Sequence, residues 1–231
     1  MPVEEVSEDN GLHVALIMDG NGRWATLRKF PRIYGHKMGI EAVRKVIEAA
    51  PRNKIGMLTL YAFSSDNWKR PPEEVTHLFS LLKSYLRQEV DSFVEKGIRL
   101  VFIGRRDRIA EGLRAEIEAA EQKTRYGEAL IVRIALDYSG REQILMALAD
   151  LPCATPEALS FALSGVGKDW PVDLLIRTSG EQRLSDFLLW ECAYAEFYFS
   201  PIHWPDFDGK ALGEAVGAYL QRDRRFGSIK T

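Results

Sequence analysis

The chain has 231 residues, of which 46% are hydrophobic and 28% charged, a composition typical of a globular protein with a sizeable core. Its formal net charge of −2 excludes the broad basic surface by which proteins bind nucleic acid, and no apolar run reaches the length of a bilayer-spanning helix. Two cysteines, Cys153 and Cys192, predict a reducing, cytoplasmic compartment without a disulfide framework, and four histidines lack the spacing of a structural zinc site.

Apolar, β-branched runs alternate with helical patterns along the chain. The alternation predicts a single α/β domain over 12–231, after a flexible arm over 1–11, with a mainly parallel six-stranded sheet flanked by helices. We expect strands near 13–18, 57–63, 99–103, 129–136, 173–177 and 196–199. We expect helices over 37–50, 73–95, 108–123, 140–150, 156–163, 185–193 and 209–221.

The first expected strand ends in Asp19-Gly20-Asn21-Gly22-Arg23. A carboxylate at a strand end can hold a hard cation such as Mg²⁺, the glycines let backbone N–H groups approach an anion, and Arg23 can pair with phosphate oxygens. Such a run is by itself more often a turn than a catalytic loop. Two further expected strands also end in polar, arginine-bearing loops, which favours a site for a metal-bound diphosphate at the carboxyl edge of the sheet.

The arginines at or beside these strand ends would form an anionic pocket if they converge, although each alone is more often a solvated surface residue. They are Arg23, Arg32, Arg70, Arg177 and Arg183. His36 is expected at the start of a helix, where a phosphate is favoured, and Trp68 in a polar loop could grip an apolar ligand or anchor the loop to the core. Glu196 is as readily a metal ligand as a solvent-facing strand terminus. No P-loop or Gly-x-Ser-x-Gly motif is present.

Five blocks together resemble the cis-prenyltransferases, also called Z-isoprenyl diphosphate synthases, and most closely the bacterial undecaprenyl diphosphate synthases. The blocks are His13–Trp24, Gly35–Gly39, Leu58–Pro71, Asp173–Trp190 and Ala195–Phe207, followed by Arg224–Gly227. They span nearly the whole chain in the order of that family. The resemblance implies a parallel six-stranded sheet with an apolar tunnel, walled by segment 73–95 and strand 99–103.

The resemblance also implies a role for each matching residue. Asp19 would bind Mg²⁺ with Glu196, and Asn67 occupies the position of a proton acceptor, although an amide is a poor base and more readily orients the substrate. The allylic diphosphate would be held by Gly20, Asn21, Gly22, Arg23, Trp24, Arg32, His36, Ser64, Ser65, Asp66, Trp68 and Arg70. Isopentenyl diphosphate would be held by Arg177, Arg183, Leu184 and Ser185. Glu74 would belong to a mobile loop, and Arg225 and Gly227 would reach the partner's site in a homodimer.

The activity implied is Mg²⁺-dependent condensation of isopentenyl diphosphate onto farnesyl diphosphate, which gives a long polyprenyl diphosphate for cell-wall carrier lipid. So apolar a product is compatible with peripheral membrane association. Two alternatives are a non-catalytic lipid-binding subunit of a heteromeric synthase and a phosphate hydrolase with Asp19 as nucleophile. Three residues depart from the family pattern: Pro31 before Arg32, Asp137 at the end of the fourth strand, and Gln182 before Arg183.

Overall fold

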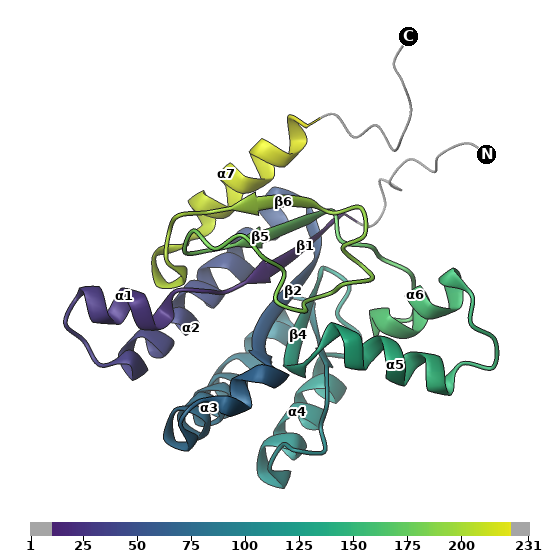
Figure 1. Cartoon of the computed structure of the whole chain (residues 1–231), viewed down its shortest axis with the longest axis horizontal. Helices are drawn as coiled ribbons and strands as arrows, with labels where there is room; N and C mark the ends of the chain where they lie inside the picture. Colours follow the sequence, from purple (N-terminus) through teal and green to yellow (C-terminus); the bar gives the residue numbers. More distant parts are fainter. Residues whose placement is uncertain (1–10, 223–231) are drawn as a thin grey trace.

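A computed structural model describes residues 11–222 of the chain. Six strands form one sheet in the order β3-β4-β2-β1-β5-β6, and every neighbouring pair is parallel (Figure 1). The strands are β1 (Leu12–Ile17), β2 (Ile55–Ser64), β3 (Ile98–Ile103), β4 (Leu130–Tyr138), β5 (Leu174–Arg177) and β6 (Glu196–Phe199). All six expected strands are confirmed. The continuous apolar runs of β1 and β4 are buried between two helical layers, whereas the edge strand β6 is only partly buried.

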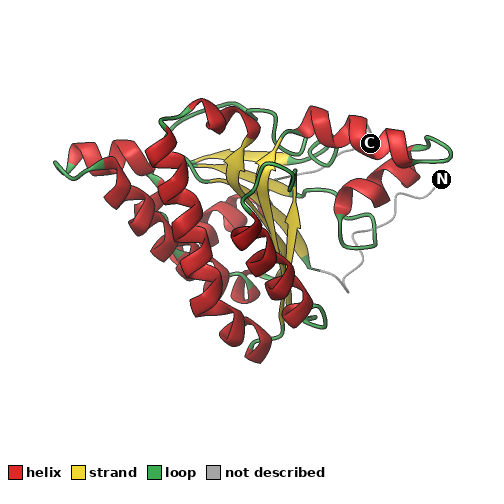
Figure 2. Cartoon of the chain, turned by 90° about the horizontal axis from the view of Figure 1, so that it is seen from below, coloured by secondary structure: helices red, strands yellow, loops and turns green. Residues whose placement is uncertain are grey.

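The helices cover both faces of the sheet (Figure 2). They are α1 (Asn21–Leu27), α2 (Arg32–Ala49), α3 (Pro72–Glu95), α4 (Glu111–Thr124), α5 (Gly140–Asp150), α6 (Pro156–Ser164) and α7 (Gly209–Leu220). Short 3₁₀ turns, η1 (Pro51–Asn53), η2 (Ser65–Lys69) and η3 (Trp204–Asp206), lie between them. None of these helices, within residues 11–222, is long and apolar enough to cross a membrane.

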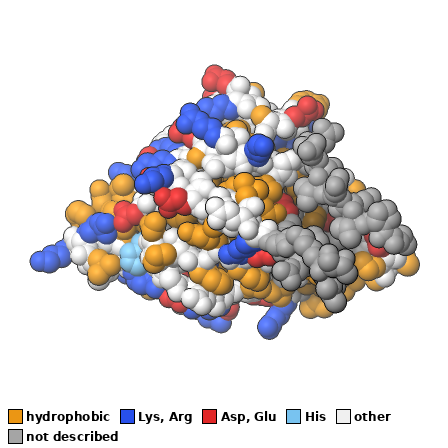
Figure 3. Space-filling view, turned by 90° about the horizontal axis from the view of Figure 1, so that it is seen from above, with side chains coloured by type: hydrophobic (Ala, Val, Ile, Leu, Met, Phe, Trp, Pro, Cys, Tyr) orange, Lys and Arg blue, Asp and Glu red, His pale blue; other side chains and the backbone are white. Residues whose placement is uncertain are grey.

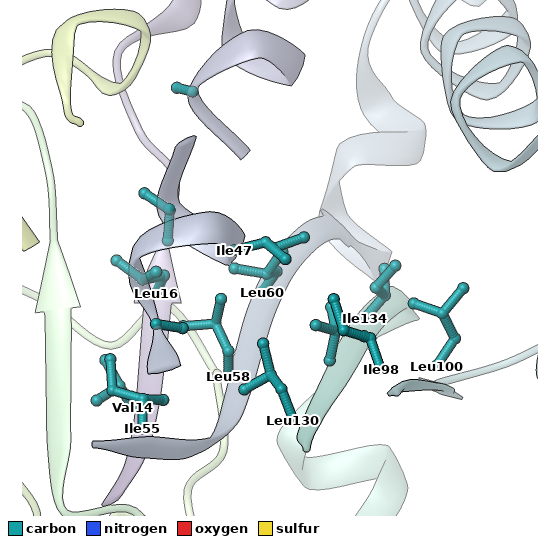
Figure 4. Packing of buried hydrophobic residues seen from close by; sticks show 14 of the residues in the cluster. Val14, Leu16, Ile47, Ile55, Leu58, Leu60, Ile98, Leu100, Leu130 and Ile134 are labelled. Carbon is teal, nitrogen blue, oxygen red and sulfur yellow. The ribbon is translucent and has the colours of Figure 1, made fainter. Parts of the chain in front are cut away.

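The two faces of the sheet carry separate hydrophobic clusters because successive strand residues point to opposite sides. Val14 and Leu16 face the larger cluster, which α2, α3, α4 and α7 complete, and Figure 4 shows its packing against β2 and β4. Ala15 and Ile17 face a smaller cluster that is closed by Val166 and by residues of segment 184–197. The larger cluster therefore extends from the sheet to the helices that border the site described below.

One predicted helix is wrong because of backbone conformation, one helix was missed, and one begins earlier than predicted. The segment over 185–193 forms turns and no helix, since Ser185, Asp186 and Leu188 have φ values of 51°, 63° and 44°, in the left-handed region that a helix cannot include. The run after Asp19 turns at Gly20, with φ 105°, and α1, which was not among the predicted helices, begins immediately at Asn21. α2 also starts at Arg32, five residues before the predicted start at 37, with Pro31 at its N-terminal boundary.

Candidate active site

A cavity of about 420 Å³ opens at the carboxyl ends of β1, β2, β4 and β5, between the sheet, α2 and α3. Its lining divides into two chemically distinct parts. Polar residues form one part: Asp19, Gly20, Asn21, Gly22, Arg23, Arg32, His36, Ser64, Asn67, Arg70, Arg177 and Ser185. Apolar residues form the other: Ile40, Val43, Leu60, Leu78, Phe79, Leu82, Ile134 and Leu136, with Tyr85. Such a cavity suits a molecule with an anionic head and an apolar tail.

Asp19 follows the carboxyl end of β1 and is fixed by hydrogen bonds at both backbone and side chain. Its N–H donates to Thr178 Oγ1 (2.9 Å), and the Thr178 hydroxyl donates to the Asp19 carbonyl (2.7 Å). Arg23 Nη2 and Arg177 Nη2 donate to the two carboxylate oxygens at 2.9 and 3.0 Å. Burial acts to raise the pKa of Asp19, but these two guanidinium hydrogen bonds outweigh it and hold the pKa below its usual value. The carboxylate is therefore charged.

Glycines let α1 and α2 approach each other behind this carboxylate. A Cβ on Gly35 would lie 2.0 Å from the Asn21 carbonyl oxygen, and a Cβ on Gly22 would lie 2.6 Å from Arg32 Nη1. Close approach brings the Arg32 guanidinium and the imidazole of His36, which lies in the second turn of α2, to the cavity. Sequence reasoning placed both residues in the site but expected Arg32 in a loop, whereas α2 holds it.

Glu74, in the first turn of α3, contacts two arginines and a histidine of the cavity. His36 Nε2 lies 3.3 Å, Arg70 Nη1 3.2 Å and Arg32 Nε 3.8 Å from its carboxylate. Burial lowers the pKa of His36, although the nearby Glu74 charge acts in the opposite direction. One carboxylate thus faces two arginines, and the cluster keeps a positive charge with which it can bind an anion.

Arg177 connects Asp19 to the loop after β5. Its Nη1 donates to Ser185 Oγ (2.8 Å) and to the Arg183 carbonyl, and the side chain is 5% exposed. Its Nε atom is buried and has no hydrogen-bond partner among residues 11–222. A buried guanidinium N–H without a protein acceptor is costly, which is compatible with an acceptor supplied by a ligand or by water.

Three residues predicted beside Arg177 have different positions. Ser185 lines the cavity, while Leu184 packs against the smaller hydrophobic cluster and Arg183 is 58% exposed. Arg183 pairs with Glu181, which also accepts a hydrogen bond from Arg23 (2.7 Å). Glu181 thus links the two strand-end loops, a role that the sequence analysis did not assign.

Asn67 lies in η2, where its amide is already engaged. Its Oδ1 accepts the Ser64 N–H at 3.1 Å, and the Ser64 side chain accepts the Asn67 N–H, which together form a capping box. One lone pair of the carbonyl oxygen is thus used within the turn, and an amide oxygen is in any case a poor base. This geometry suits an orienting role, and the role of proton acceptor stays a prediction.

The other predicted residues of this turn do not line the cavity. The Ser65 hydroxyl donates to Asp137 Oδ1 (3.0 Å), and exposed Asp66 pairs with Lys69 (2.6 Å). Trp68 packs edge-on against Phe79 with ring centroids 5.3 Å apart, so the reading as an anchor to the core is confirmed. These three residues therefore stabilise the η2 turn without lining the cavity.

Asp137, one of the three departures from the family pattern, is fully buried at φ 48° at the end of β4. Both of its carboxylate oxygens accept hydrogen bonds from the Arg108 guanidinium, through Nε (2.9 Å) and Nη2 (2.5 Å). The carboxylate therefore has a charged partner, which accounts for an acidic residue at this position.

Two further predicted residues lie away from the cavity. Trp24 is buried outside the cavity, where its Nε1 donates to Asp206 Oδ1 (2.7 Å). Glu196 begins β6, pairs in register with Leu174, and binds Arg222 (2.6 Å), so it lies at the amino edge of the sheet, whereas Asp19 follows the carboxyl edge. Glu196 therefore cannot share a metal with Asp19 of the same chain. Arg225 and Gly227 lie outside the described residues.

The Asp19 carboxylate suits a cation that takes most of its ligands from a substrate. Residues 11–222 contain no group of three or more histidine, cysteine or acidic side chains that could enclose a metal. Asp19 offers charged oxygen ligands beside the arginines, and Mg²⁺ characteristically binds one or two carboxylates together with water and phosphate oxygens. The donor set is thus suited to a magnesium ion that arrives with a diphosphate.

Apolar residues of α2 and β4 complete the cavity in a way that was only partly predicted. Segment 73–95 does supply Leu78, Phe79 and Leu82, but β3 does not line the cavity, because β4 lies between it and β2. Ile40 and Val43 of α2 take its place. Their spacing of three residues was the available sequence signal, since it puts both on one helix face.

Comparison with known proteins agrees with this arrangement. A family model described as "Putative undecaprenyl diphosphate synthase" matches residues 17–227. Isoprenyl transferase 1 of Bradyrhizobium diazoefficiens is 52% identical over 233 residues, which cover 100% of this chain and 95% of the relative. The isoprenyl transferase of Agrobacterium fabrum is 45% identical over 94% of this chain and 92% of its own.

Two crystal structures have the same fold. Lavandulyl diphosphate synthase from Lavandula x intermedia, in complex with dimethylallyl diphosphate, superposes with a TM-score of 0.90 at 32% identity, over 96% of this chain and 100% of that one. A probable undecaprenyl diphosphate synthase from Campylobacter jejuni superposes with a TM-score of 0.79 at 32% identity, over 94% and 99% of the two chains.

Proposed function

Because this chain belongs to the family of isoprenyl transferases and undecaprenyl diphosphate synthases, and is thus a prenyltransferase, we propose that it makes a long-chain Z-polyprenyl diphosphate. It adds isopentenyl diphosphate units to an allylic primer, farnesyl diphosphate, and the product is undecaprenyl diphosphate for cell-wall carrier lipid. The single observation that carries this proposal is the cavity in which an arginine-rich polar part continues into an apolar wall.

The polar part supports two diphosphate subsites on either side of Asp19. Arg32, His36 and Arg70, with the α1 N-terminus and Ser64, would hold the allylic diphosphate. Arg177 and Ser185, with Arg183 and Leu184 behind them, would hold isopentenyl diphosphate. The apolar residues of α2, α3 and β4 would enclose the growing chain, because burial of each added unit stabilises the complex.

In each cycle the double bond of isopentenyl diphosphate attacks C1 of the allylic diphosphate, the C1–O bond breaks, and a proton leaves the new chain. Mg²⁺ held by Asp19 would offset the negative charge of the leaving diphosphate. The arginines would donate to the same oxygens, and one of them, Arg177, has an N–H on Nε without a protein acceptor among residues 11–222. Since the Asn67 amide is a poor base, and its oxygen already accepts the Ser64 N–H, we assign the departing proton to a diphosphate oxygen or a water.

We further propose that the enzyme is a cytoplasmic homodimer. The proposal is supported by large apolar side chains exposed on α5, α6 and the segment after Ser185: Leu145, Met146, Phe161, Trp190 and Tyr194. Trp190 Nε1 donates to Ser160 Oγ (2.9 Å), which places this segment against α6. The alternative of a non-catalytic subunit is disfavoured because Asp19, Arg177 and Arg183 are all present.

The test is incubation with labelled isopentenyl diphosphate, farnesyl diphosphate and Mg²⁺, with products resolved by chain length. We expect one long product that is lost on chelation and in Asp19→Ala. Release of phosphate without a new carbon–carbon bond would instead show a hydrolase. No incorporation with any allylic primer would reject the enzyme proposal.

A further inference from the structure

The end of α1, the turn after it and the start of α2 expose four large apolar side chains. Leu27, Phe30, Ile33 and Tyr34 are 71%, 46%, 44% and 38% exposed, and all nine residues from 26 to 34 are exposed. We call residues 26–34 the α1–α2 tip. It projects at one end of the molecule, away from the sheet (Figure 1). An apolar group of this size on a surface marks an interaction site.

The tip is rigid, which lowers the cost of inserting it into a partner. Phe30 and Tyr34 pack with ring centroids 4.7 Å apart, and each stacks on the buried Trp24 ring at 6.4 and 6.2 Å. Trp24 is held in turn by its hydrogen bond to Asp206. The apolar side chains are therefore displayed by a braced scaffold.

The tip is also basic. The chain has five lysines and arginines between Asp19 and Glu41, and no acidic residue: Arg23, Arg28, Lys29, Arg32 and Lys37. Arg23 pairs with Asp19 and Glu181, Arg28 pairs with Asp206, and Arg32 lies near Glu74. Lys29 and Lys37 have no ion pair among residues 11–222, so they supply the excess of positive charge around the exposed apolar side chains. Figure 3 shows hydrophobic and basic surface meeting at this end of the molecule.

The tip adjoins the polar mouth of the cavity. That mouth is lined by Gly22 and Arg23, which precede the tip in sequence, by Arg32 within it, and by His36, which follows it. Whatever binds the tip therefore lies next to the diphosphate subsites. This position matters because the proposed product carries its diphosphate at the mouth and a long apolar tail.

We propose that the α1–α2 tip docks this enzyme onto an anionic lipid bilayer. Exposed aliphatic and aromatic side chains beside lysines and arginines are the composition that enters the headgroup region of a membrane. The positive charge selects an anionic surface, and it disfavours a second copy of the same tip, since like charges would meet. The biological purpose of this docking rests on the proposed function: an enzyme bound at the membrane surface delivers its amphiphilic product to the interface where that product must reside.

Vesicle sedimentation tests the docking without reference to catalysis. The probes are vesicles of phosphatidylcholine alone and with about one-third phosphatidylglycerol, at low and high salt. The apolar variant is Leu27→Ser/Ile33→Ser, since neither residue belongs to the aromatic stack or the cavity. Its matched control is Leu220→Ser/Val94→Ser, because those residues are 67% and 45% exposed on other helices.

We expect the wild type to bind the anionic vesicles in preference to neutral ones, with a loss at high salt. Leu27→Ser/Ile33→Ser should weaken binding by about tenfold or more, and the control should stay within about twofold. Lys29→Asn should weaken binding by about fivefold at low salt, and asparagine tolerates the φ of 61° at that position.

Three results would overturn the docking surface. They are no binding of the wild type to anionic vesicles, equal losses in the tip variant and its control, or a change of oligomeric state in the tip variant by light scattering, which would assign the tip to a protein contact. Condensation of short, water-soluble primers in detergent, measured in the same variants, should be unchanged. Its absence in the wild type would reject the proposed function and leave the vesicle result standing on its own.

Discussion

Replacing Gly35 by alanine tests how closely α1 and α2 must approach to form the allylic subsite. The added Cβ would lie 2.0 Å from the Asn21 carbonyl oxygen and 3.1 Å from Ala25 Cβ. Ordinary contact begins at 3.4 Å, so the helices must separate by about 1.4 Å (3.4 − 2.0). Both atoms of the worst contact are tied to backbone, and no side-chain rotation can relieve it.

The expected loss of stability combines two opposing effects. Forced overpacking costs roughly 3 kcal/mol, at the upper end of its usual range, while alanine gains about 1 kcal/mol over glycine as a helix former. The net loss of about 2 kcal/mol in the free energy of unfolding corresponds to a Tm lower by about 4–8 °C for a chain of this size. Because Arg32 and His36 move with α2, kcat/KM should fall by about 100-fold.

Gly217→Ala is the matched control for Gly35→Ala. Gly217 lies inside α7, and a Cβ there would meet nothing within 4 Å. Only the helix-propensity gain applies, so the Tm should rise by about 2–4 °C with unchanged activity. Thermal unfolding by circular dichroism and steady-state kinetics measure both variants. If Gly35→Ala matched Gly217→Ala in stability and kept its kcat/KM, the close approach of α1 and α2 would not be what forms the subsite.

Three further outcomes are expected. Arg177→Met removes donors to Asp19 and Ser185 and should lower kcat by about 100- to 1,000-fold in steady-state assays. Arg183→Met, at an exposed site, should chiefly raise KM for isopentenyl diphosphate. Equal effects of the two substitutions would contradict the central position of Arg177. Burial lowers the pKa of His13 to about 3, below the unfolded value of 6.5, so the unfolded chain binds more protons and stability falls as pH drops below 6.5. Urea unfolding should show a loss of about 2 kcal/mol from pH 7 to pH 5, and a loss that persists in His13→Gln would assign it to another group. Leu82→Trp fills part of the apolar wall and should shorten the product in chain-length analysis; a product of full length would place the growing chain elsewhere.

The fold could be predicted from the chain because each central strand is buried on both faces and carries a continuous apolar run. Alternation with helices then implies parallel pairing, and parallel pairing implies that the loops after β1, β2 and β5 share one edge. For this reason Asp19, Asn67 and Arg177 could be expected in one place from the sequence.

Prediction from the local sequence pattern failed where backbone φ angles lie in the left-handed region. Nothing in the apolar spacing of segment 185–193 distinguishes it from a helix, and only the contacts around it select turns. Tyr61 OH donates to the Ser185 carbonyl (3.2 Å), and the Ser139 hydroxyl donates to Asp186 Oδ2 (2.6 Å). These partners lie 124 and 47 residues away in sequence, so tertiary contacts outweigh helix propensity there.

The sequence by itself determined the class of fold, the edge that carries the site and the kinds of side chain found there, because those depend on period, composition and strand direction. Only the tertiary structure decided at which edge of the sheet Glu196 lies and which group hydrogen-bonds to the Asn67 side-chain oxygen. It separated Glu196 from Asp19 by placing them at opposite edges of the sheet, and it committed the Asn67 carbonyl to Ser64. Both outcomes depend on register and packing between distant segments, which no spacing along a single chain encodes.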